Sequence, residues 1–212
     1  MRALLAALGA NSCVSCTTAG ADCLDDRLCG DCARALPTSP SVQPAPEACT
    51  EAWAWGDYAG AVGELVRVAK YRPDEGLARV LVGAARLRSG TPVGYDAIVP
   101  VPAGRWRTWR RGFSLPSLLA EKLADAGSTP VRRCLERGDA SAQAGVSRSA
   151  RRSHAAGVWS VRGPARGNVL LVDDVLTSGA TVSACAAALL GAGAARVDVF
   201  VLAAAHRPQP RG

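Results

Sequence analysis

The apolar positions of the chain follow two periods from about residue 51 onward. Residues 52–55 read Ala-Trp-Ala-Trp, and this period of two predicts a strand. Apolar side chains then recur at helical spacing over residues 62–69, and a second helical stretch covers residues 75–88. Residues 96–102, Asp-Ala-Ile-Val-Pro-Val-Pro, predict a buried strand that ends in a proline-stiffened loop. This alternation is typical of an α/β domain.

The following segment mixes regular and irregular stretches. Residues 115–126 predict a helix, and residues 131–135 are a further candidate strand. Residues 136–156 are rich in Ser, Arg and Ala and have no clear period. We expect this polar segment to form a long excursion or a mobile flap.

A β-α-β unit follows. Four aliphatic residues at 169–172 predict a buried strand, residues 180–190 a helix and residues 197–202 a second strand. The right-handed crossover of such a unit implies parallel strands. The predicted fold is therefore α/β with a parallel sheet core, and ligands of such sheets bind beyond the carboxyl ends of the strands.

The chain of 212 residues is 49% apolar, enough for one medium α/β domain with a small appendage. We divide it into a small module at residues 1–36, a proline-rich linker at 37–50 and the α/β domain at 51–212. Residues 1–10 have one Arg before eight apolar residues and no convincing cleavage site, so we interpret them as a short amphipathic helix. No apolar run reaches about 18 residues, so we expect no membrane insertion, a cytoplasmic protein and reduced cysteines.

Two Cys-x-x-Cys pairs, separated by twelve residues, lie in the N-terminal module. They are formed by Cys13, Cys16, Cys29 and Cys32. Two such turns can complete a tetrahedral Zn²⁺ site, and the metal would supply stability that so short a segment lacks. We therefore predict a structural zinc ion. Cys23 is either a replacement ligand or a free thiol.

The net charge of +7 lies in one region, because residues 105–152 alone carry +7 and the remainder sums to zero. This indicates an anionic partner for that segment. Other motifs exclude whole classes of enzyme. The two lysines, Lys70 and Lys122, follow no Gly-x-x-x-x-Gly spacing, which excludes a P-loop NTPase. His154 and His206 form no His-Glu-x-x-His motif, which excludes a helical zinc protease.

The predicted strand at residues 169–172 leads into two carboxylates, Asp173 and Asp174. A loop that opens the next helix follows, with Thr177, Ser178, Gly179, Ala180 and Thr181. Free N–H groups and the dipole at a helix N-terminus suit a phosphate, while adjacent carboxylates suit ribose hydroxyls. A ribose with a 5′-phosphate meets both needs, so we take Asp173 and Asp174 as candidate catalytic residues. The alternative is an ordinary capped strand–turn–helix.

This string resembles the phosphoribosyl-pyrophosphate (PRPP) motif of the type I phosphoribosyltransferases. Further motifs occur in the order seen in the ComF family: the doubled Cys-x-x-Cys, Lys70-Tyr71, Val99-Pro-Val-Pro102, Arg110-Arg-Gly-Phe113, Gln143 and Arg152. Ser114, Leu115, His154 and Trp159 depart from the residues usual in that family. The resemblance implies a phosphoribosyltransferase-like domain behind a zinc finger, PRPP binding with Mg²⁺, and a role in DNA uptake during natural competence.

The basic segment after Pro102 admits three interpretations. Arg105, Arg107, Arg110 and Arg111, together with Lys70, are candidate ligands of the pyrophosphate. Alternatively, Trp106 and Trp109 stack the bases of single-stranded DNA while the arginines contact its phosphates. The third interpretation is a solvated basic face with inward-packed tryptophans.

Two hypotheses about function follow from these motifs. One is a working phosphoribosyltransferase with an unknown acceptor. The other is a non-catalytic module that senses PRPP or a nucleotide and binds single-stranded DNA or a competence helicase. The fold cannot decide between them, since one fold supports many functions.

Overall fold

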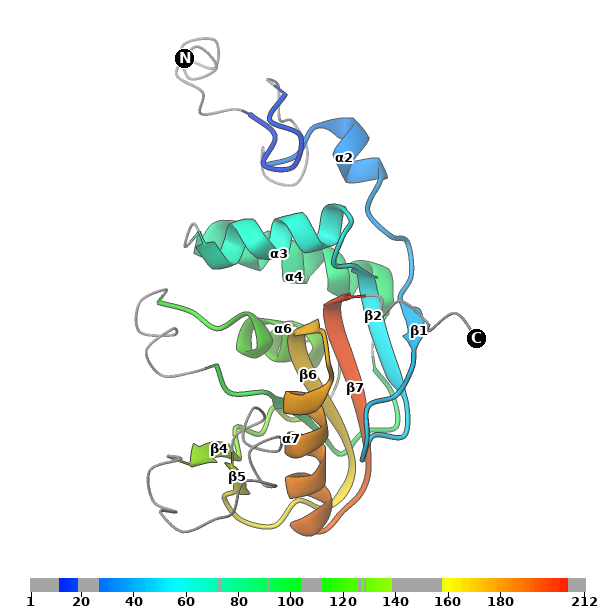
Figure 1. The fold of residues 1–212 in the computed structure, drawn as a ribbon, viewed down its shortest axis with the longest axis vertical. Coiled ribbons are helices and arrows are strands. Elements are labelled where there is room, and N and C mark those ends of the chain that lie inside the picture. The colour runs from blue at the N-terminus through cyan, green and yellow to red at the C-terminus, as the bar shows by residue number, and fades with distance from the viewer. Residues whose placement is uncertain are drawn as a thin grey trace, which may run out of the picture.

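The structure is a computed structural model, and it describes residues 12–18, 27–71, 74–90, 92–103, 112–125, 127, 129–138 and 158–205 (Figure 1). Its centre is a five-stranded sheet in the order β1 (Ser41–Gln43), β2 (Ala52–Asp57), β7 (Ala194–Ala204), β6 (Gly167–Leu176) and β3 (Ala97–Pro100). The last four strands of this order are parallel to one another, and β1 is antiparallel to β2. The predicted α/β class and the parallel β-α-β unit are thus confirmed, with an antiparallel edge that makes the sheet mixed.

Strand β6 is longer than predicted, and its last residues extend beyond the end of the neighbouring strand β3. Its neighbour β7 accompanies it as far as Leu176, which pairs with Ala204. On the other side β3 ends at Pro100, opposite Val172. Because Pro100 and Pro102 have no N–H to donate, the pairing between these strands ends early. Asp173 and Asp174 therefore follow the point where β6 loses its pairing with β3.

Helices cover both faces of the sheet (Figure 1). The helices α3 (Ala61–Tyr71), α4 (Glu75–Ser89) and α6 (Leu115–Ala124) pack on one face, and α7 (Ala180–Gly191) packs on the other. Two of their starts follow from capping side chains: Asp74 accepts the N–H of Leu77, and Ser114 accepts the N–H of Ser117. All four helices begin within a residue of the positions that the sequence predicts.

The N-terminal module packs against the α/β domain. Cys13, Leu28 and Leu36 are buried in the same apolar cluster as residues of α3 and α4. Arg27 also forms an ion pair of 2.6 Å with Asp74, the cap of α4. The short helix α2 (Gly30–Arg34) then leads into the proline-rich segment. The helix predicted at residues 1–10 lies outside the described residues.

The segment 37–50, predicted to be a linker with little to pack, contributes to the fold. Ser41–Gln43 forms β1 at the edge of the sheet. The indole N–H of Trp55 donates to the carbonyl of Pro37 over 3.2 Å, and Arg88 donates to the carbonyl of Leu36 over 3.0 Å. The domain boundaries at residues 36 and 50 stay predictions.

The candidate strand at residues 131–135 is wrong in its position. Val131 makes only an isolated bridge to Ile98, whereas the strand β4 (Leu135–Gly138) begins where the predicted strand ended. β4 pairs with β5 (Val158–Val161) in a separate antiparallel ribbon. The segment expected to be a flap therefore begins as a strand, and its residues 139–156 lie outside the described part of the chain. No helix among the described residues has the length and apolar character needed to cross a membrane.

Candidate functional site

A polar cavity of about 250 Å³ opens at the carboxyl edge of the sheet, where ligands of parallel α/β sheets bind. It collects residues from α3, the loop after β3, α6, the β4–β5 ribbon, β6 and α7. They are Lys70, Tyr71, Val101, Pro102, Ala103, Pro116, Arg137, Trp159, Asp173, Asp174 and Thr181.

An ion pair lies at one side of the cavity. Lys70 stands in the last turn of α3, and its Nζ donates to Asp174 Oδ1 over 2.6 Å. The two side chains are only 21% and 18% exposed. Because the residues are 104 positions apart in the chain, the pair also ties α3 to the end of β6. It places one cation beside the two carboxylates.

The other carboxylate has an unusual proton affinity. Burial and, after it, the charge of Asp174 raise the pKa of Asp173 to about 8. The N–H of Asp174, which donates to Asp173 Oδ1 over 2.8 Å, and the charge of Lys70 act in the opposite direction. Near neutral pH this cavity therefore holds a proton that an exposed carboxyl would have released.

The loop 177–179 joins β6 to α7 at the position where the sequence predicts a phosphate site. Gly179 caps α7 in the left-handed conformation, with φ 76°. A side chain there would lie about 3.1 Å from Pro46, so both the backbone angle and the close neighbour favour glycine. Thr177 and Ser178 are exposed on this loop. The N–H of Ala180 donates to Ser178 Oγ over 3.4 Å, while the next N–H groups of the first turn of α7 have no partner within the helix.

The predicted site residues divide into three groups. Lys70, Asp173, Asp174 and Thr181 line one cavity. Thr177, Ser178, Gly179 and Ala180 lie in the connecting loop and at the start of α7, directly before Thr181 in the chain. The basic segment with Arg105, Trp106, Arg107, Trp109, Arg110 and Arg111 lies outside the described residues, although Val101, Pro102 and Ala103 before it line the cavity.

Two side chains of the cavity were not predicted as site residues, although Trp159 stands out in the sequence as a departure from the family pattern. Arg137 and Trp159 face each other across the β4–β5 ribbon, with the guanidinium carbon 5.9 Å from the centre of the indole ring. The segment around Arg137 has no motif and no period, so no local signal marks that residue. Only the pairing of β4 with β5 brings them together at the cavity.

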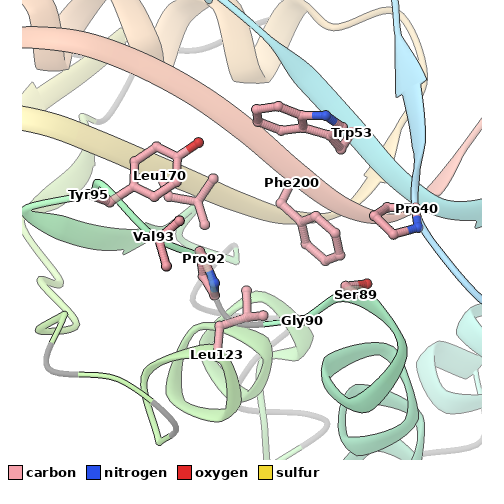
Figure 2. A pocket seen from close by; sticks show the side chains of 10 residues that line it. All are labelled: Pro40, Trp53, Ser89, Gly90, Pro92, Val93, Tyr95, Leu123, Leu170 and Phe200. Atoms are coloured by element: carbon pink, nitrogen blue, oxygen red, sulfur yellow. The ribbon is translucent and has the colours of Figure 1, made fainter.

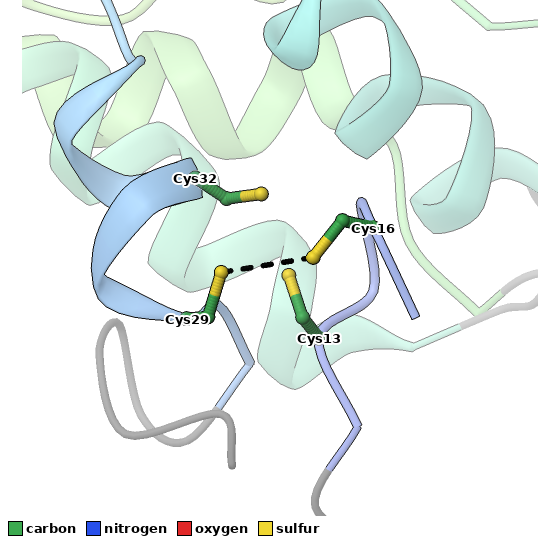
Figure 3. Close-up of side chains that lie close together, drawn as sticks. All are labelled: Cys13, Cys16, Cys29 and Cys32. Carbon is green, nitrogen blue, oxygen red and sulfur yellow. Dashed lines mark hydrogen bonds between the residues drawn. The ribbon is translucent and has the colours of Figure 1, made fainter. Parts of the chain in front are cut away.

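The four cysteines of the N-terminal module converge (Figure 3). Their Sγ atoms all lie within 4.8 Å of one another, and those of Cys16 and Cys29 are 3.6 Å apart. A tetrahedral zinc ion with Zn–S bonds of about 2.3 Å requires sulfur atoms about 3.8 Å apart, so the cluster fits a structural zinc ion. None of the four forms a disulfide. Among the described residues they form the one group of three or more potential metal ligands.

The thiols of this cluster differ in acidity. The hydroxyl and the backbone of Thr18 lower the pKa of Cys16 to about 6, whereas burial and neighbouring thiols raise the pKa of Cys32 to about 12. A bound zinc ion holds all its cysteine ligands as thiolates. Cys23 lies outside the described residues.

Comparison with known proteins identifies the class. No family model matches the chain. The DNA utilization protein YhgH of Escherichia coli K12 is 31% identical over 199 residues, which cover 84% of each chain. The YhgH protein of Salmonella typhi is 38% identical over 132 residues, or 59% of this chain and 58% of that protein. Competence protein F of Haemophilus influenzae is 32% identical over 117 residues, or 52% and 51%.

The fold and the carboxyl-edge cavity define an α/β protein with a four-cysteine module in front. The similarity to YhgH over 84% of the chain then makes the family plain. The chain belongs to the ComF family, as the order of its motifs predicted.

Proposed function

We propose that the protein has a type I phosphoribosyltransferase-like domain, binds PRPP together with Mg²⁺ in the carboxyl-edge cavity and transfers the phosphoribosyl group to an acceptor. The observation that carries this proposal is the meeting of three features at one place. The loop into α7 is suited to a phosphate, Asp173 and Asp174 are suited to a ribose diol, and Lys70 adds a cation. PRPP contains the three groups that these features would recognise.

Different residues of the cavity and the loop would contact different parts of PRPP. N–H groups at the start of α7 and the hydroxyls of Thr177 and Thr181 would donate to the 5′-phosphate. Asp173 and Asp174 would accept hydrogen bonds from the ribose hydroxyls and fix the orientation of the sugar. Lys70 would lie close to the diphosphate once Asp174 turns to the ribose, with the arginines of the basic segment as further candidates.

Magnesium fits this site only in company with the ligand. Mg²⁺ keeps several waters and is commonly held by one or two carboxylates plus substrate phosphates. The cavity offers two carboxyl groups: Asp174 is paired with Lys70, and Asp173 would have to release its proton to hold the ion. The described residues form no all-protein magnesium cage there. When bound with PRPP, the ion would neutralise charge on the leaving diphosphate.

The proposed reaction needs no protein nucleophile. A nitrogen or phosphate of the acceptor would attack the anomeric carbon while the bond to the diphosphate breaks. The protein would contribute by orienting the sugar and by excluding water from the cavity. Trp159 and Arg137 lie on the β4–β5 side of the cavity, where the acceptor would enter.

The biological setting comes from the relatives, whose names refer to DNA utilization and competence. We propose a role of this protein in the same process, with single-stranded DNA and a competence helicase as candidate partners. The second candidate function is a non-catalytic module that senses PRPP or a nucleotide. The elevated pKa of Asp173 favours neither function, because both would place a phosphorylated ribose beside that carboxyl group.

Pyrophosphate release separates the two. The protein is incubated with PRPP and Mg²⁺ and a series of nucleobase and nucleotide acceptors. Release that depends on one acceptor and is lost in Asp173→Asn supports the transferase. PRPP binding without release on any acceptor supports the sensor, and absence of both refutes the proposal.

A further inference from the structure

A second cavity, of about 260 Å³, lies on the face of the sheet that α4 and α6 cover (Figure 2). Its lining comes from the segment before β1, from β2, β6 and β7, from the ends of α4 and α6, and from the loop before β3. The residues are Pro40, Trp53, Ser89, Gly90, Pro92, Val93, Tyr95, Leu123, Leu170 and Phe200. They share no residue with the lining of the carboxyl-edge cavity.

The cavity walls are aromatic and uncharged. Trp53 and Phe200 are directly paired across β2 and β7, so their side chains stand next to each other on one face of the sheet. Tyr95 adds a third ring to the lining (Figure 2). Because these ten lining side chains carry no charge, the part of a ligand that enters must be neutral. Aromatic walls favour a flat ring.

Two hydroxyl groups give the cavity polar character. Ser89 Oγ at the end of α4 is buried and has no hydrogen-bond partner among the described residues. A buried hydroxyl of this kind is uncommon in folded proteins, since leaving it unpaired is unfavourable. The Ser89 oxygen has almost no exposed surface, so its side chain must turn toward the cavity before a ligand can bind it. A ligand with a hydrogen-bonding edge would then satisfy it. A purely aliphatic or phenyl group would leave it unpaired.

The second hydroxyl is held in place from behind. Tyr95 donates its hydroxyl hydrogen to Asp198 Oδ2 over 3.0 Å. Asp198 is only 1% exposed and also accepts from Arg196 and from the N–H of Glu51. This fixes the Tyr95 hydroxyl as a donor to Asp198, so its oxygen has acceptor capacity left for a ligand.

From these observations we infer that this cavity is a binding site for one nucleobase. A base is flat, neutral and carries donors and acceptors on its edge, which matches the aromatic walls and the two hydroxyls. The volume lies below the range of about 300–1,000 Å³ found for drug-sized ligands, and so suits a single ring system. The base comes either from a free nucleoside or from a DNA strand. Val93 of the lining is 82% exposed, so the cavity reaches the protein surface at this residue.

The test titrates the full-length protein with thymidine, deoxyadenosine and oligothymidylate by calorimetry and ligand-observed NMR. Ser89→Ala should weaken binding about five- to tenfold, and Trp53→Leu about tenfold or more. Ser183→Ala, on the opposite face in α7, is the matched serine control and should bind as the wild type does. Asp173→Asn and Trp159→Leu, in the carboxyl-edge cavity, should leave this binding unchanged. Thermal unfolding of each variant confirms that it is folded.

The outcomes distinguish the two sources of the base. Equal binding of nucleoside and oligonucleotide assigns the site to a free nucleoside. Binding of the oligonucleotide alone assigns it to a strand if Trp53→Leu weakens that binding, and overturns the inference if Trp53→Leu does not. The inference is overturned if neither probe binds, or if binding is lost in Trp159→Leu but kept in Ser89→Ala. It is also overturned if N-acetyltryptophanamide binds more tightly than any base, because the cavity would then receive a protein side chain.

Discussion

Replacement of Lys70 by Met tests whether the ion pair with Asp174 organises the carboxyl-edge cavity. The pair is 2.6 Å long, and its two side chains are about one-fifth exposed. Removing one partner of a fully buried pair costs about 3–5 kcal/mol, while an exposed pair contributes about 0–1 kcal/mol. For this part-buried pair we expect Lys70→Met to lower the free energy of unfolding by about 2–3 kcal/mol.

The chain supplies its own control in its other lysine. Lys122 lies 3.4 Å from Asp125, with 48% and 64% of the two side chains exposed, so Lys122→Met should cost less than about 1 kcal/mol. Urea unfolding followed by circular dichroism measures both variants. Lys70→Met combined with Asp174→Asn should recover part of the loss, because no unpaired carboxylate remains at position 174. Equal, small losses in both single variants would refute this account of the cavity.

Three further predictions concern the fold, the metal and the pH response. A Cβ on Gly63 would lie 1.8 Å from the carbonyl oxygen of Tyr58, so Gly63→Ala should destabilise the protein by about 3 kcal/mol or more in the urea assay. Gly83 has open space around it, so Gly83→Ala should stabilise the protein by about 0.5–1 kcal/mol in the same assay. Chelation of zinc, or Cys16→Ser, should lower the melting temperature because the N-terminal module shares an apolar core with α3 and α4. Cys134→Ser is the control and should retain one zinc ion per chain by metal analysis. An unchanged melting temperature after complete zinc loss would contradict this prediction. The folded protein keeps a proton on Asp173 up to about pH 8, whereas the unfolded chain releases it near pH 4. The free energy of unfolding should therefore fall as the pH rises from about 4 to about 8, by at most about 1.4 kcal/mol per pH unit. Asp173→Asn should remove this slope, and an identical slope in the variant would disprove the assignment.

The regular elements could be predicted because each has a local cause. Period-two and helical spacing marked β2 and α3, and Asp74 and Ser114 begin α4 and α6 as capping residues. The doubled Cys-x-x-Cys likewise predicted a cluster that the structure brings together. Local signals of this kind agree with the final structure wherever the fold buries the apolar face of the element.

The features that the sequence analysis predicted wrongly or did not predict depend on contacts between residues far apart in the chain. The end of β6 is set by β7 on one side and by the early end of β3 on the other, and neither is visible in residues 169–176. The edge strand β1 forms because β2 offers it a partner, although its segment is proline-rich. Arg137 and Trp159 meet only through ribbon pairing.

Calorimetry of the full-length protein with PRPP and Mg²⁺ tests most directly whether the carboxyl-edge cavity and the loop into α7 bind this ligand. We predict saturable binding at one site per chain. Gly179→Ala should weaken it at least about tenfold, since a side chain there strains the loop and meets Pro46, and Gly83→Ala should leave it unchanged. Absence of any binding heat with the wild type, or equal affinity in Gly179→Ala, would contradict the central claim.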